Sequence, residues 1–184
     1  MDKIFTCGTA RGGTNLFTNI LNVNNEVQIA QDPFLGIWKS LRDAVVRKSN
    51  TKDFIYNSPL GEYYYSPRDI SVMKLIQNCS LLSDFDPTER EKLLQTLESR
   101  IGLSSPLLKK HLHLIKGCNY KEIVESSLEV IKIAWDTKEK RVIGINENWI
   151  IEFFLCLATA FPNSKFVVYI RDVRASIASA LELL

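Results

Sequence analysis

Short apolar runs bounded by turn residues predict four β-strands along the chain. These runs are Ile4–Cys7, Glu26–Ala30, Arg141–Glu147 and Lys165–Ile170. The last run, K-F-V-V-Y-I, lacks polar alternation, which is typical of a central parallel strand covered on both faces. Between and after the strands, apolar residues recur at helical spacing. The helices expected from this spacing are Thr14 onward, Leu35–Arg47, Arg68–Asn78, Pro87–Arg100, Tyr120–Trp135, Ile150–Ala160 and Arg174 onward.

The order of these elements is β-α-β, a helical stretch, then β-α-β-α. This order is typical of an α/β domain with three layers and a mostly parallel central sheet. We expect a single domain over residues 1–184, with a helical insert at about 35–135. The segment Ser49–Pro67, with its three consecutive tyrosines at 63–65, is expected to form a loop.

The clearest helix start lies at Asp86-Pro87. Asp86 is a good N-cap, Pro87 suits the first helical position, and Glu89 can complete a capping box. We expect this helix to run to Arg100, because Gly102 follows and glycine commonly ends helices.

Composition limits the classes of function. The chain is 46% hydrophobic and 24% charged, with a net charge of +2, which favours a folded protein and gives no reason to expect a nucleic-acid or membrane partner. From the position of the first strand we expect no signal peptide, and no apolar run reaches the ~18 residues of a membrane helix. We therefore expect a cytoplasmic protein whose four cysteines, none in a CxxC motif, are reduced thiols.

The first chemical motif is the turn Gly8–Asn15 between the first strand and the first helix. Backbone N–H groups at a helix N-terminus bind anions, and Arg11 adds a positive charge with forked donors. Gly8 and Gly13 have Walker A spacing, but Thr14-Asn15 replaces the Lys-Ser/Thr pair that binds phosphate and magnesium. The alternative is a glycine turn that only joins the strand to the helix.

The second motif follows the last strand. Arg171 leaves the carboxyl end of that strand, and Ser179 lies eight residues later in the next helix. Together they could hold a second phosphate. The alternative is that Arg171 and Asp172 form a surface ion pair, worth about 0–1 kcal/mol.

Taken together, the two motifs resemble those of the sulfotransferases that use 3′-phosphoadenosine 5′-phosphosulfate (PAPS). Arg11-Gly12-Gly13-Thr14-Asn15 resembles the family's 5′-phosphosulfate loop except at Asn15, and Arg171 with Ser179 resembles its 3′-phosphate motif, with Val173 in place of a common proline. The resemblance implies a P-loop-like fold, PAPS as co-substrate and no metal. It also implies that Arg11 contacts the transferring group. The cofactor-binding residues that it implies are Arg11, Gly12, Gly13, Thr14, Asn15, Arg171 and Ser179.

Transfer to a hydroxyl also needs a general base. Asp32, after the second strand, stands where carboxylate-using members of the family often carry an acid, and the alternative is that it caps the next helix. Glu147, at the end of the third strand, is the second candidate, as base or as substrate ligand. His111 and His113 lie far from any strand end and are expected to be exposed or structural.

The resemblance implies an acceptor hydroxyl, of a carbohydrate or a small metabolite. The competing interpretations are a P-loop kinase or nucleotide hydrolase, and an inactive phosphate-binding domain. Family members continue beyond the position of Leu184, so we expect the C-terminal part of the family domain to be missing here. The sequence leaves open whether the protein forms a homo-oligomer.

Overall fold

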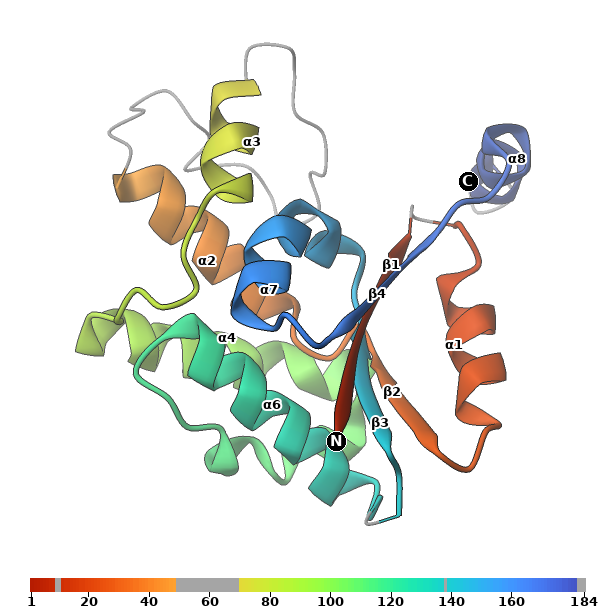
Figure 1. Ribbon diagram of the computed structural model, residues 1–184, viewed down its shortest axis with the longest axis horizontal. Coiled ribbons are helices and arrows are strands. Elements are labelled where there is room, and N and C mark those ends of the chain that lie inside the picture. Colours follow the sequence, from red (N-terminus) through yellow and green to blue (C-terminus); the bar gives the residue numbers. More distant parts are fainter. Residues whose placement is uncertain (9–10, 49–69, 138, 182–184) are drawn as a thin grey trace.

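The structure, a computed structural model, describes residues 1–8, 11–48, 70–137 and 139–181 (Figure 1). Its elements along the chain are β1 (Asp2–Gly8), α1 (Thr14–Asn22), β2 (Val27–Gln31), α2 (Leu35–Lys48), α3 (Ile70–Gln77), α4 (Pro87–Ser104), α5 (Pro106–Lys109), the 3-10 helix η2 (Leu112–Leu114), α6 (Tyr120–Ala134), β3 (Val142–Asn146), the 3-10 helix η3 (Asn148–Phe153), α7 (Phe154–Ala160), β4 (Lys165–Tyr169) and α8 (Val173–Leu181).

The four strands form one parallel sheet in the order β2-β3-β1-β4. The α/β class, the parallel sheet and the helical insert between β2 and β3 are thereby confirmed. On β1, Thr6 is in register with Asn146 of β3 on one side and with Val167 of β4 on the other. Because all strands run in the same direction, the loops that follow them gather at one edge of the sheet, where ligands of such folds bind.

Helices cover the two faces of the sheet unequally (Figure 1). α2, α4, α6 and α7 lie on one face and enclose the main core, in which Phe5, Ile145, Trp38 and Phe153 are completely buried. α1 lies on the other face, so the described elements form three layers. None of the described helices has both the length and the apolar character needed to cross a bilayer.

α1 packs differently from what its apolar spacing suggests. The helix buries Thr14 and Thr18, whereas Leu16 and Ile20 are more than half exposed. The reason is close packing at its start, where a Cβ added to Gly8 would lie 2.6 Å from Thr14 Cγ2. Only small side chains allow the helix to approach the sheet so closely.

The start of α4 is as expected and its end is not. The Asp86 side chain accepts a hydrogen bond from the Thr88 N–H at 2.7 Å, and Glu89 completes the capping box. The helix continues through Gly102 to Ser104 rather than ending at Arg100. It ends before Pro106, because the residue preceding a proline is disfavoured in the helical region and Ser105 is non-helical there.

Two further expectations are corrected. β4 is not a central strand covered on both faces: it lies at the edge of the described sheet, with Val168 42% exposed. The predicted helix Ile150–Ala160 is divided into η3 and α7, and its first part is a 3-10 helix. The loop predicted over Ser49–Pro67 lies outside the described residues.

Candidate functional site

The loop after β1 leads directly into an uncapped helix N-terminus. Arg11 has a left-handed backbone (φ 61°), and so does the N-cap residue Gly13 (φ 88°). No side chain caps α1, and its first intrahelical bond runs from the Phe17 N–H to the Gly13 carbonyl. The N–H groups of the first helical residues therefore lack intrahelical partners, and a positive helix end faces the carboxyl edge of the sheet.

Residues from the far end of the chain complete this loop. The Arg11 guanidinium donates from Nε and Nη2 to the Ser179 hydroxyl, at 3.2 and 3.0 Å. Arg171 Nη1 donates to the Arg11 carbonyl at 3.0 Å. The structure thus brings together the three residues that the two sequence motifs single out, although 168 positions separate Arg11 from Ser179.

Aromatic packing fixes the end of β4 against α1. The rings of Tyr169 and Phe17 lie 4.4 Å apart between centroids. Tyr169 is largely buried, and this burial raises the pKa of its phenol. Arg171 follows two residues later, so its position depends on this contact between β4 and α1.

The alternative role for Arg171, an ion pair with Asp172, is not what the structure shows. Asp172 instead binds Arg174, whose Nη2 donates to Oδ2 at 2.7 Å and whose Nε donates to Oδ1 at 3.1 Å. Within the described ranges, neither Arg11 nor Arg171 forms an ion pair with a carboxylate. Two guanidinium groups without carboxylate partners therefore lie beside a positive helix end, an arrangement suited to a multiply charged anion.

No protein-family model matches the chain, and no curated protein or solved structure is significantly similar to it. The function must therefore be argued from the chemistry of the site.

A pair of acids occupies the same edge of the sheet, after β3, the neighbour of β1, and after β2, the next strand. Because Gln31 of β2 is in register with Asn146 of β3, Asp32 and Glu147 are the next residues on two neighbouring strands. The Glu147 N–H also donates to the Thr6 carbonyl of β1 at 2.9 Å. The two carboxyl groups, 115 residues apart in sequence, are hydrogen-bonded to each other.

The two acids must share a proton. Glu147 is 2% exposed, and its Oε2 receives no hydrogen bond from a donor of the described residues. Burial raises the pKa of Glu147 well above its ordinary value, and the negative charge of Asp32 adds to this effect. Burial also raises the pKa of Asp32, but the hydrogen bond from Glu147 opposes the rise. Glu147 is therefore the protonated donor, and Asp32 is the acid that ionises first.

The alternative role for Asp32, as an N-cap, does not fit the geometry. α2 begins at Leu35, three residues later, and the Phe34 N–H at its start donates to Glu147 rather than to Asp32. Asp32 itself has a left-handed backbone (φ 43°), a conformation that aspartate tolerates better than most residues. It is only partly buried, so its carboxylate stays accessible.

Asn146 was missed by the sequence analysis. Its side chain is completely buried at the end of β3. Oδ1 accepts a hydrogen bond from the Thr6 hydroxyl at 2.9 Å, whereas Nδ2 has no partner among the described residues. An amide at the end of an otherwise apolar strand was the available signal.

The two histidines lie away from this edge of the sheet. His111 and His113 lie around η2 and are not strongly buried, in agreement with the expected exposed or structural role. Among the described residues, no three His, Cys, Asp or Glu side chains are grouped so that they could hold a metal ion.

We expect the shared proton to make stability depend on pH. A carboxyl whose folded pKa is raised stabilises the fold below its unfolded pKa, ~4.3 for glutamate, and this contribution is lost as pH rises through the folded value. The loss reaches at most about 1.4 kcal/mol per pH unit for one proton. Glu147→Gln should remove this slope, as measured by urea unfolding between about pH 4 and pH 8. An unchanged slope in the variant would contradict the shared proton.

Proposed function

We propose that the protein is a sulfotransferase that moves a sulfuryl group from PAPS to an acceptor hydroxyl. The observation that carries the proposal is the convergence of Arg11, Arg171 and Ser179 at an uncapped helix N-terminus. Such a site offers cations, a hydroxyl and backbone N–H groups to a ligand with two separate anionic groups. PAPS has this character, with a 3′-phosphate at one end and a 5′-phosphosulfate at the other.

The roles of the residues follow from their positions. Backbone N–H groups at Thr14 and Asn15 would hold the 5′-phosphosulfate, with Arg11 stabilising the charge that develops on its bridging oxygen. Arg171 and Ser179 would hold the 3′-phosphate. When the sulfuryl group moves to the acceptor, the S–O bond to the 5′-phosphate breaks, and adenosine 3′,5′-bisphosphate leaves.

The acid pair supplies the second half of the proposal. The acceptor hydroxyl must lose its proton as the new S–O bond forms, and Asp32 is an accessible carboxylate with a raised pKa at the same edge of the sheet. Glu147 would hold Asp32 in place through the shared proton. Helices of the insert cover one face of the sheet beside this edge (Figure 1). The acceptor would therefore bind between the sheet edge and the insert.

Calorimetric titration separates this proposal from a kinase or nucleotide hydrolase. We expect adenosine 3′,5′-bisphosphate to bind without magnesium, and ATP with magnesium to bind more weakly or not at all. Tight binding of magnesium-ATP with no binding of the bisphosphate would exclude the proposal. Transfer of radiolabelled sulfate from PAPS to a panel of sugar and small-molecule hydroxyls then distinguishes an enzyme from a phosphate-binding protein.

Replacing Arg171 tests the 3′-phosphate site. A charge-assisted hydrogen bond is worth about 1.5–3 kcal/mol, so Arg171→Ala should weaken bisphosphate binding by about 10–100-fold. Arg174→Ala is the matched control, because Arg174 lies in the same segment but binds Asp172. Equal affinities for the two variants would argue against this role for Arg171.

A further inference from the structure

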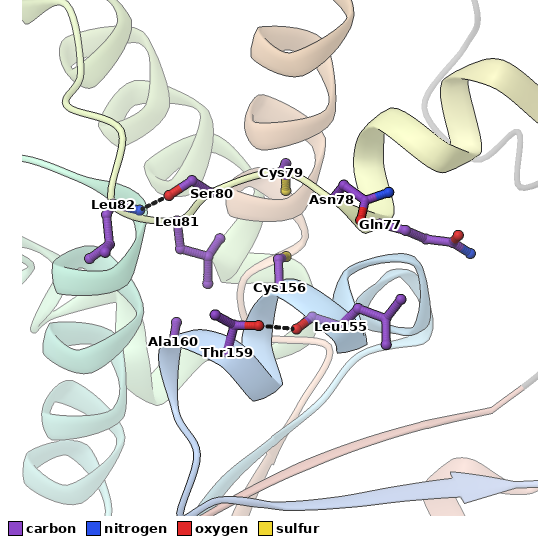
Figure 2. A pocket seen from close by; sticks show the side chains of 10 residues that line it. All are labelled: Gln77, Asn78, Cys79, Ser80, Leu81, Leu82, Leu155, Cys156, Thr159 and Ala160. Atoms are coloured by element: carbon purple, nitrogen blue, oxygen red, sulfur yellow. Dashed lines mark hydrogen bonds between the residues drawn. The ribbon is translucent and has the colours of Figure 1, made fainter.

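Two cysteines from distant parts of the chain line one cavity on the helical side of the sheet. The cavity has a volume of about 340 Å³ and lies between α7 and the segment that follows α3. Figure 2 shows Cys79 on that segment and Cys156 on α7, on facing walls with their sulfur atoms toward each other. The two thiols are close enough to form a hydrogen bond.

The two hydroxyl side chains that line the cavity form hydrogen bonds with nearby backbone groups. Thr159 Oγ1 donates to the Leu155 carbonyl at 3.0 Å, and Ser80 Oγ accepts from the Leu82 N–H at 3.2 Å, as Figure 2 shows. The cavity lining also includes the apolar side chains of Leu81 and Leu155. The thiols are therefore the nucleophilic groups that this cavity presents.

The surroundings make the two thiols unequal. Cys79 is partly exposed, and the hydrogen bond from Cys156 lowers its pKa, which favours the thiolate. Cys156 is 4% exposed, and the same contact, together with burial, raises its pKa. Cys156 Sγ also lies 3.1 Å from the Phe153 carbonyl oxygen, an alternative acceptor for the same proton. Cys79 is thus suited to attack an electrophile, and Cys156 lies across the cavity from it, where it can react with the product.

The other two cysteines lack this arrangement. Cys7 is completely buried in β1, and burial raises its pKa to about 12. Cys118 is exposed, and no pairing with a second thiol is found for it. Of the four cysteines, Cys79 and Cys156 are therefore the two that are placed to react with each other.

We propose that Cys79 and Cys156 are a redox modification site that hydroperoxides convert to a reversible disulfide. The Cys79 thiolate attacks a peroxide oxygen, the O–O bond breaks, and water or an alcohol leaves with a proton from solvent, so that Cys79 becomes a sulfenic acid. The Cys156 sulfur then attacks the Cys79 sulfur, the S–O bond breaks, and the hydroxyl leaves as water with the Cys156 proton. Two electrons pass from the thiols to the peroxide, and a small dithiol can return them by exchange.

The disulfide would connect two parts of the fold that lie far apart in the sequence. Cys79 belongs to the helical insert, whereas Cys156 lies on the helix that continues from η3, which itself follows Glu147. The bond would close a long loop, and such a bond restricts the unfolded chain. We expect the oxidised protein to have a higher Tm than the reduced one.

Thiol counting in a Cys118→Ser background tests the proposal, because removal of the exposed thiol prevents links between molecules. Titration under denaturing conditions should find three thiols before hydrogen peroxide treatment and one afterwards, with a non-reduced peptide map joining Cys79 to Cys156. Dithiothreitol should restore all three. Three remaining thiols, or a link that involves Cys7, would overturn the proposal.

Single variants distinguish the two roles. With Cys156→Ser, oxidation of Cys79 should stop at the sulfenic acid, which dimedone traps. With Cys79→Ser, Cys156 should stay a free thiol under the same treatment. Rapid oxidation of Cys156 in the absence of Cys79 would contradict the order of attack, and circular dichroism confirms that each variant is folded.

Discussion

Arg11→Ala is expected to reduce sulfuryl transfer by at least about 10²–10³-fold, the usual effect of removing one preorganised donor at a developing negative charge. Arg11 is exposed, and its hydrogen bonds to other described residues are those from its guanidinium to Ser179 and from Arg171 to its carbonyl. Its loss should therefore leave the fold unchanged. Initial rates of radiolabelled sulfate transfer from PAPS measure the effect.

Arg141→Ala is the matched control for Arg11. Arg141 is also an exposed arginine, but it pairs with Glu26 at the opposite end of the sheet. Arg11→Lys separates charge from geometry, because a lysine keeps the positive charge but lacks the planar fork of donors. Full activity of Arg11→Ala, or equal losses for Arg11→Ala and Arg141→Ala, would show that the loop after β1 does not act on the transferring group.

Asp32→Asn is expected to lower kcat by about 10²–10⁴-fold, the range for loss of a general base. The change keeps the size of the side chain and removes its proton affinity. Bisphosphate affinity should not change, since Asp32 follows β2, which β3 separates from β1 and the anion site. In the wild-type protein, kcat should rise with pH through the raised pKa of Asp32, because the base acts only when ionised; this rise should be absent from the variant.

Asp84→Asn is the control for this substitution, because Asp84 is exposed and lies in the insert at a bridge with Asn119. Glu147→Gln adds a second comparison. If Glu147 positions Asp32, the glutamine variant should keep the pH-dependent rise of kcat, but the midpoint of the rise should move. A pH profile that is identical in wild-type protein and Asp32→Asn would exclude Asp32 as the base.

The fold class could be predicted from the sequence because local patterns fix the order of the elements. The helix start at Asp86 was also predictable, since capping depends only on neighbouring residues. The ends of helices and the neighbours of each strand were harder to predict. β4 reads as a central strand because Val167, Val168 and Ile170 are apolar, yet no described strand covers its outer edge. Apolar residues show that a surface needs burial, but they do not identify what buries it.

The site was predictable in its parts but not as a whole. Arg11, Arg171 and Ser179 could be selected from two motifs, and the structure adds that Arg11 contacts both of the other residues. Asp32 and Glu147 stood as separate candidates in the sequence. Their pairing depends on β2 and β3 being neighbours, which follows from the order of strands in the sheet and not from any local pattern.

The strand order also has a consequence for synthesis of the protein. β1 and β2 emerge early from the ribosome, but among the described strands both pair with β3, and the other neighbour of β1 is β4. At ~5–20 residues per second, the two early strands wait on the order of ten seconds for their first partner. Ser179 emerges later still. The nascent chain therefore carries two unpaired strands until β3 emerges, and the anion site is the last part of the described fold that translation can complete.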